Sequence, residues 1–351
     1  MIMKQATRLI GSLLAALSFA GAAHAQDVRI LGRSQITPEG GFAIQWPASG
    51  FEATFTGGTL TATIDDWGAN WLNVEVDGVA TKVALREGTN SYTLFEGAPG
   101  PHKIKVTRRT GTDVGVTRIV EVKAAGLSAT TAPEQRLLVI GDSFASGHGV
   151  EGANGACTDV HGVQNADLAF PAVLAKSFGA DVHVVAADGR GLMRNFGGTG
   201  PAMGTLAWQT LQDGDAAWAA LAWQPQVIVI ELGTNDFNAG DPGEAFSEAY
   251  VLLLRKLRTA YPDAQIIGSL GGSLWGKRYE AAKGSISGAI DFVRKAGDDK
   301  VAFIEMKLST GPGRYGCDNH PGIRGQAQMA AALQREITRI AGWKPVEVLA
   351  D

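Results

Sequence analysis

The first third of the chain alternates between apolar and polar residues in short segments that are rich in Thr and Val. This period of two is typical of strands that bury only one face. Turn residues such as Gly57-Gly58 and Asp77-Gly78 separate the segments. The expected strands cover residues 51–55, 59–64, 72–76, 81–85 and 102–106. The pattern predicts a small all-β sandwich, jelly-roll-like, over residues 26–125.

Continuous apolar runs replace this alternation later in the chain. Residues 126–135 contain Ser, Ala, Thr and Pro and indicate a linker. The apolar runs that follow cover residues 136–140, 182–185, 227–230, 265–268 and 301–304. Such runs favour parallel strands covered on both faces. Helical periodicity covers residues 244–260, 280–296 and 325–340. We therefore expect a doubly wound parallel α/β sheet with helices on both faces over residues 136–351.

The N-terminus has the features of a secretory signal peptide. Lys4 and Arg8 precede an apolar stretch over residues 9–22, and Ala23-His24-Ala25 fits a cleavage site before Gln26. We expect a signal peptide over residues 1–25 and export to the periplasm or the medium. The apolar stretch is short for a membrane span, and no later stretch is long and apolar enough. No membrane contact is expected after cleavage.

Composition narrows the class of protein. The 351 residues are 45% hydrophobic and 19% charged, which fits a globular chain that is soluble. A formal net charge of −4 lacks the basic footprint of a nucleic-acid binder. In an oxidising compartment Cys157 and Cys317 can pair, so a disulfide is favoured over two free thiols. The composition indicates no oligomeric state.

Four polar clusters carry the candidate chemistry. Three of them follow apolar runs, where sites form at the carboxyl ends of parallel strands. They are Gly141-Asp142-Ser143, residues 188–195 and Gly233-Thr234-Asn235-Asp236. A Ser on a tight turn exposes its hydroxyl, and an Asn amide is a neutral donor for a developing oxyanion. The fourth cluster, residues 318–321, precedes the last helix.

His320 in the fourth cluster is the best candidate for a general base. It has an acid, Asp318, two residues before it and Pro321 after it. A histidine in this role takes a proton from Ser and returns it to a leaving group. His148, which lies soon after Ser143, is its main rival.

The order of these blocks resembles the SGNH hydrolase (GDSL esterase) superfamily. Gly141-Asp142-Ser143, Gly191, residues 233–236 and His320 match its four blocks, and the match extends from about Arg136 to the C-terminus. Within that superfamily the chain resembles carbohydrate esterase family two. Members of that family have a β-sandwich ahead of the hydrolase domain, an Arg-Asn segment like residues 189–195 and a Gly-Cys-Asp-x-His-Pro run like residues 316–321.

The resemblance implies Ser143 as nucleophile and His320 as general base. The backbone N–H groups of Ser143 and Gly191 and the Asn235 amide would form the oxyanion hole, with Gly189 as the alternative to Gly191. It also implies removal of O-acetyl groups from polysaccharides of the xylan or glucomannan type through an acyl-enzyme. The expected partner is an acetylated polysaccharide or oligosaccharide, and neither a metal nor another cofactor is expected.

One departure from the superfamily pattern concerns the orienting acid. The superfamily places its Asp three residues before the His, whereas Asp318 lies two before His320. Either the Asp318 carboxylate or a backbone carbonyl therefore orients the imidazole.

The sequence leaves the substrate contacts and three other functions open. A sugar-stacking platform is one interpretation of four tryptophans, although packing in the core is favoured for each of them: Trp208, Trp218, Trp223 and Trp275. The first alternative function is an SGNH esterase, lipase or thioesterase that acts on other esters. The second is an esterase of O-acetyl-peptidoglycan, and the third is a carbohydrate-binding protein whose hydrolase site is inactive.

Overall fold

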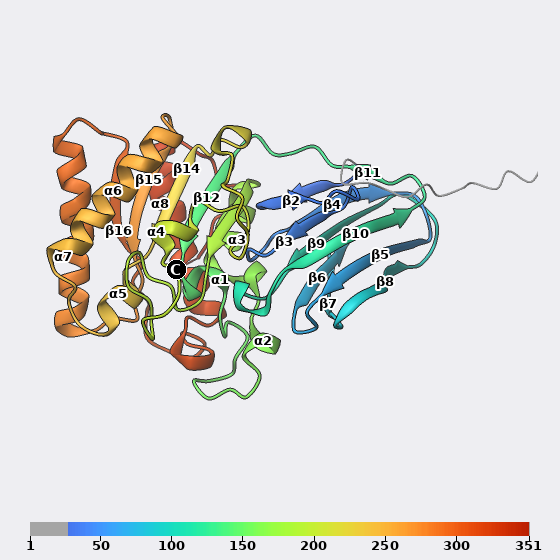
Figure 1. Ribbon diagram of the computed structural model, residues 1–351, viewed down its shortest axis with the longest axis horizontal. Coiled ribbons are helices and arrows are strands. Elements are labelled where there is room, and N and C mark those ends of the chain that lie inside the picture. The colour runs from blue at the N-terminus through green and yellow to red at the C-terminus, as the bar shows by residue number, and fades with distance from the viewer. Residues whose placement is uncertain (1–26, 351) are drawn as a thin grey trace, which may run out of the picture.

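The structure is a computed structural model that describes residues 27–350 (Figure 1). The predicted signal peptide, residues 1–25, and Gln26 after its cleavage site lie outside the described residues.

Two antiparallel sheets form the N-terminal part, which confirms the prediction of an all-β sandwich. The first sheet has the order β1 (Arg29–Leu31), β4 (Gly50–Phe55), β9 (His102–Arg108), β6 (Trp71–Val76) and β7 (Val79–Ala84). The second has the order β2 (Ser34–Ile36), β3 (Phe42–Ile44), β10 (Thr117–Ala124), β5 (Thr59–Asp66) and β8 (Gly88–Glu96). Apolar residues from alternate positions, among them Phe51, Ile64 and Val106, fill the space between the sheets.

The segment expected to be a linker contains a short strand. β11 (Ser128–Ala129) pairs antiparallel with β4, with Ser128 opposite Thr54. Part of the segment between the two units is therefore held by main-chain hydrogen bonds to the sandwich.

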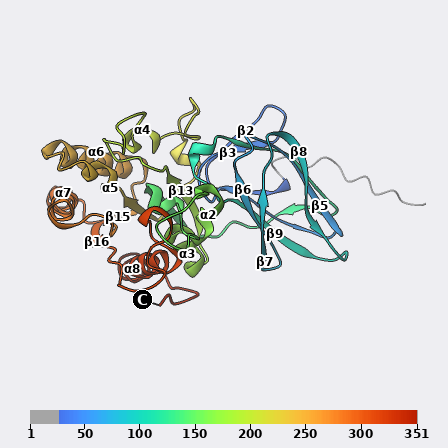
Figure 2. The ribbon, with the colours of Figure 1, turned by 90° about the horizontal axis from the view of Figure 1, so that it is seen from below.

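Five parallel strands form the C-terminal sheet. Its order is β13 (Asp181–Ala186), β12 (Arg136–Gly141), β14 (Val227–Glu231), β15 (Gln265–Leu270) and β16 (Val301–Glu305). Helices α6 (Glu244–Ala260) and α7 (Gly276–Lys295) cover one face, and α3 (Phe170–Phe178) and α8 (Ile323–Ala341) cover the other (Figure 2). The prediction of a doubly wound α/β sheet is confirmed.

Amphipathic patterns account for the long helices. In α6 the residues that face the sheet, including Phe246, Tyr250 and Leu254, recur every three or four positions. The remaining helical segments are short turns: η2 (Thr112–Val114), α1 (Ser143–Ser146), α2 (Val160–Val163), η3 (Ala166–Leu168), α4 (Met203–Leu206), η4 (Ala220–Ala222), α5 (Thr234–Asn238) and η5 (Cys317–Asn319). Within residues 27–350, no helix combines the length and the apolar character needed to cross a bilayer.

The strand order determines where a site can form. β12 lies between β13 and β14, so the chain leaves β12 toward one side of the sheet and later returns on the other. The crevice at such a switch point, outside the carboxyl ends of the strands, is the usual binding site in this architecture. Ser143 follows β12 and Asn235 follows β14, so both lie at this crevice.

Buried polar contacts join the sandwich to the α/β unit. The Arg33 guanidinium donates to the carbonyl oxygens of Ala207 at 2.8 Å and Gln209 at 2.7 Å. The indole N–H of Trp46 donates to the Thr210 carbonyl at 2.9 Å. Because a buried donor is costly when it is unpaired, these contacts favour a fixed arrangement of the two units.

Candidate active site

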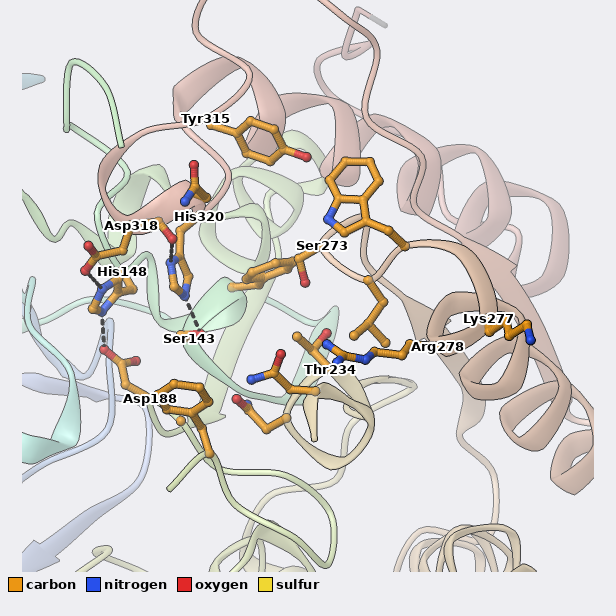
Figure 3. A pocket seen from close by; sticks show the side chains of 18 residues that line it. Ser143, His148, Asp188, Thr234, Ser273, Lys277, Arg278, Tyr315, Asp318 and His320 are labelled. Carbon is orange, nitrogen blue, oxygen red and sulfur yellow. Dashed lines mark hydrogen bonds and ion pairs between the residues drawn. The ribbon is translucent and has the colours of Figure 1, made fainter. Parts of the chain in front are cut away.

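The turn between β12 and α1 positions Ser143. The Asp142 side chain caps α1 by accepting the Phe144 N–H at 3.0 Å. The Ser143 hydroxyl then lies 2.8 Å from Nε2 of His320, in a cavity of about 990 Å³ (Figure 3). Ser143 is only 7% exposed. Its backbone N–H donates to no group among residues 27–350 and is free to bind an oxyanion.

A backbone carbonyl orients His320. Nδ1 of His320 lies 3.1 Å from the carbonyl oxygen of Asp318. Because a carbonyl can only accept, it holds the proton on Nδ1 and leaves Nε2 to accept the Ser143 proton. Of the two groups that the sequence leaves open, the backbone carbonyl of Asp318 is the one that contacts Nδ1. Asp318 and Asn319 have positive φ angles of 51° and 57°, and the carboxylate points toward His148 instead (Figure 3).

His148, the rival base, lies beside His320 rather than on Ser143. Its Nδ1 lies 2.8 Å from Asp188 and its Nε2 lies 3.2 Å from the Asp318 carboxylate. Burial lowers the pKa of His148, but the hydrogen bond and charge of Asp188, and then of Asp318, raise it to about 9. His148 is therefore a cation near neutral pH and cannot serve as the base.

The environment of His320 keeps it neutral. Burial, followed by the positive charge of His148, lowers the pKa of His320 to about 4, although Asp188 and Asp318 oppose this shift. The two imidazole rings lie 4.3 Å apart between their centroids. The pair thus divides into one cation and one neutral base.

A disulfide holds the turn that carries His320. Cys157 and Cys317 are bonded, as the sequence favoured. The Cys317 N–H donates to the Gly149 carbonyl at 2.9 Å and the Asp318 N–H donates to the Gly155 carbonyl at 3.1 Å. The disulfide and the two main-chain hydrogen bonds therefore hold the loop before His320 against the loop after Ser143.

Asn235 lies at the cavity with its amide already engaged. Its Nδ2 donates to the Asp142 carboxylate at 3.1 Å and to the Arg190 carbonyl at 3.0 Å. One of these bonds must be exchanged or shared when the amide donates to an oxyanion. The two contacts hold the amide next to Ser143 in the meantime.

The structure does not support Gly191 as an oxyanion donor. Its N–H donates to the side-chain oxygen of Asn195 at 3.2 Å. A Cβ at this position would lie 2.5 Å from the Asp236 carboxylate, so the glycine permits close packing. Gly189, the alternative, has a φ of 70° and lines the cavity. In the described part of the chain nothing accepts its N–H.

Two acids that the sequence analysis gave no role support the site. Asp236 accepts the backbone N–H groups of Leu192 at 2.8 Å, Met193 at 2.9 Å and Arg194 at 2.9 Å, and so shapes the loop after β13. Glu231 ends β14, where burial and the charge of Asp142 raise its pKa and favour a protonated carboxyl bonded to Asp142. The signal that could have revealed Glu231 is its place as an acid at the end of an apolar strand.

Of the four tryptophans considered as sugar platforms, Trp275 lines the cavity, and it is 64% exposed. Trp223 stacks on His183 at 3.6 Å, and Trp218 lies edge-on to the same ring. Trp208 packs against the core.

The sandwich lies behind the site rather than along the cavity. The residues that line the cavity all come from the α/β unit. Gly111, in the loop after β9, lies close to Asp188. A Cβ added at Gly111 would lie 3.3 Å from the Asp188 carboxylate. The sandwich thus covers the acid that holds His148.

Comparison with known proteins agrees with this arrangement. Residues 30–133 match the model of the carbohydrate esterase 2 N-terminal family, and residues 139–348, more than half of the chain, match the GDSL-like lipase/acylhydrolase family. Fold and site define a hydrolase of the SGNH class. The chain belongs to the GDSL-like lipase/acylhydrolase family and, within it, to carbohydrate esterase family two.

Individual relatives extend over most of the chain. A family two carbohydrate esterase from Clostridium thermocellum, solved with cellohexaose, is 30% identical with a TM-score of 0.87, over 90% of this chain and 100% of that one. The cellulase/esterase CelE of Acetivibrio thermocellus is 30% identical over 89% of this chain, which spans 39% of that protein. An acetylxylan esterase/glucomannan deacetylase of Cellvibrio japonicus is 34% identical over 60% of each chain.

The carbonyl contact predicts a mild effect of Asp318→Asn. Asn tolerates the left-handed conformation of residue 318, and the substitution keeps the carbonyl that orients His320. We expect kcat/KM on 4-nitrophenyl acetate to fall by about tenfold or less. A carboxylate that oriented the base directly would cost about 10⁴-fold when changed to the amide. A loss of that size in Asp318→Asn would contradict the assignment.

The low pKa of His320 predicts activity in mild acid. Protonated His320 cannot accept the Ser143 proton, so kcat/KM should fall only as the pH drops toward about 4. With an ordinary histidine as base, this acidic limb of the pH–rate profile would lie near pH 6.5, at about the unperturbed pKa of histidine. The His148→Gln variant removes a neighbouring positive charge and should move the limb to higher pH. Initial rates between pH 3.5 and 8, with folding checked by circular dichroism, measure the position of the acidic limb in both proteins. A wild-type limb near pH 6.5 would contradict the low pKa of His320.

Proposed function

We propose that this protein is a serine esterase that removes O-acetyl groups from polysaccharides of the xylan or glucomannan type. The observation that carries the proposal is the 2.8 Å contact between Ser143 Oγ and a His320 Nε2 that is free to accept its proton. Membership of carbohydrate esterase family two and the names of the relatives support the substrate class.

The first half of the reaction acylates Ser143. His320 takes the hydroxyl proton while Oγ attacks the acetyl carbonyl, and a tetrahedral oxyanion forms. The backbone N–H groups of Ser143 and Gly189 and the Asn235 amide stabilise this oxyanion. The loss of one such donor typically costs about 10²- to 10³-fold in rate.

Collapse of this intermediate completes the acylation. The His320 imidazolium gives its proton to the sugar oxygen, the C–O bond breaks and the acetyl group stays on Ser143. The second half of the reaction releases acetate. Water then attacks the acetyl-enzyme with His320 as the base, and Ser143 leaves with the returned proton. The Asp318 carbonyl accepts the Nδ1 proton throughout. Side chains, main-chain groups and water carry every step, without a cofactor.

The sugar is proposed to stack on Trp275. Its exposed ring lines the cavity, and an aromatic face suits the apolar face of a sugar ring. The proposed domain division is a sandwich over residues 26–125, a linker over residues 126–135 and a hydrolase domain over residues 136–351, which carries the cavity.

Export is proposed for the same protein. The leader pattern of residues 1–25 and the disulfide between Cys157 and Cys317 support a periplasmic or secreted location.

The nucleophile is tested with Ser143→Ala. We expect acetate release from acetylated xylan and acetylated glucomannan to fall by about 10⁴-fold or more, because no acyl-enzyme can form. Ser287→Ala, on α7 away from the cavity, is the matched control and should retain wild-type rates. The wild type should also prefer 4-nitrophenyl acetate over the butyrate and octanoate.

Two outcomes would contradict the proposal. Full activity in Ser143→Ala would exclude this nucleophile. Wild-type rates that rise with acyl length, with no acetate released from either polysaccharide, would indicate an esterase for lipid-like substrates.

A further inference from the structure

Two cationic side chains lie at one end of the catalytic cavity. Lys277 and Arg278, in the first turn of α7, line the cavity and are exposed. Over residues 27–350, neither side chain makes an ion pair or hydrogen bond. Figure 3 shows that Arg278 reaches into the cavity toward Thr234, whereas Lys277 points away from it.

The placement of Arg278 is not explained by the stability of α7. The first turn of a helix favours acidic side chains, because the dipole is positive there. The first turn of α7 contains no acid, whereas α6 has Glu244 in the corresponding turn. A cation here gains nothing from the helix and is available for a ligand.

The acids of the cavity do not neutralise this end. Asp188 and Asp318 also line the cavity, but both contact His148. The hydroxyl oxygens of Thr234 and Ser273, on the same side of the cavity as Arg278, have no partner within the described residues. This end therefore offers a cation and two hydroxyls without a matching anion.

We infer that the substrate carries a carboxylate close to the acetyl ester, as in an acetylated polysaccharide that bears uronic acid, and that Arg278 binds that carboxylate. This inference rests on the proposed function and names its substrate class. A guanidinium can donate two parallel hydrogen bonds to a carboxylate, whereas a neutral sugar offers only hydroxyls. The contact lies at a solvent-exposed end of the cavity, so it selects among substrates rather than deciding whether the reaction occurs.

The test compares acetylated xylo-oligosaccharides of equal backbone length, with and without a glucuronic acid branch. We expect wild-type kcat/KM for acetate release to be about tenfold higher on the acidic substrate, the effect of one charge-assisted hydrogen bond. Arg278→Gln should bring the ratio between the two substrates to about one. Lys295→Gln, at the far end of α7, makes the same change in charge and should keep the wild-type ratio.

The outcomes separate this inference from the proposed function. Acetate release from both substrates at equal rates, or an acidic preference that survives in Arg278→Gln, would overturn the role of Arg278 while the esterase stands. If Lys295→Gln loses the preference for the acidic substrate as fully as Arg278→Gln does, the preference comes from net charge. This result would also overturn the role of Arg278. The absence of acetate release from both substrates would overturn the proposed function and this inference together.

Discussion

The proposed chemistry depends on the hydrogen bond between Nδ1 of His320 and the carbonyl oxygen of Asp318, at 3.1 Å. The carbonyl sets the tautomer, and the tautomer decides whether Nε2 can accept a proton from Ser143. A carbonyl does this without the full negative charge of a carboxylate. The imidazolium of the transition state therefore draws its electrostatic support from the two nearby carboxylates, Asp188 and Asp318, against the cation His148.

Segments far apart in the chain keep that carbonyl in place. The left-handed pair Asp318 and Asn319 turns it toward the ring, and the disulfide and main-chain bonds to the loop after Ser143 hold the turn. His148 bridges Asp318 to Asp188, and Gly111 of the sandwich packs against Asp188. The sandwich thus supports the site from behind although it lines none of the cavity.

The strands and the long helices could be predicted because they follow from local periodicity, and three of the polar blocks because each follows an apolar strand. The fourth block, residues 318–321, was predicted from its neighbouring acid and proline and from the resemblance to the superfamily. Which group of Asp318 faces His320 could not, because it depends on the φ angles of two residues. The choice between Gly191 and Gly189 as backbone donor also depends on contacts that the local sequence does not reveal, since Asp236, distant in sequence, packs on Gly191. The role of His148 depends on Asp188, a partner 40 residues away.

Nitrogen-15 NMR of protein labelled at histidine tests the central claim most directly, with His148→Gln and His320→Gln variants assigning the signals. At pH 7 we expect a neutral His320 with its proton on Nδ1 and an unprotonated Nε2, beside a His148 that is protonated on both nitrogens. A His320 that is charged at pH 7, or that carries its proton on Nε2, would contradict it.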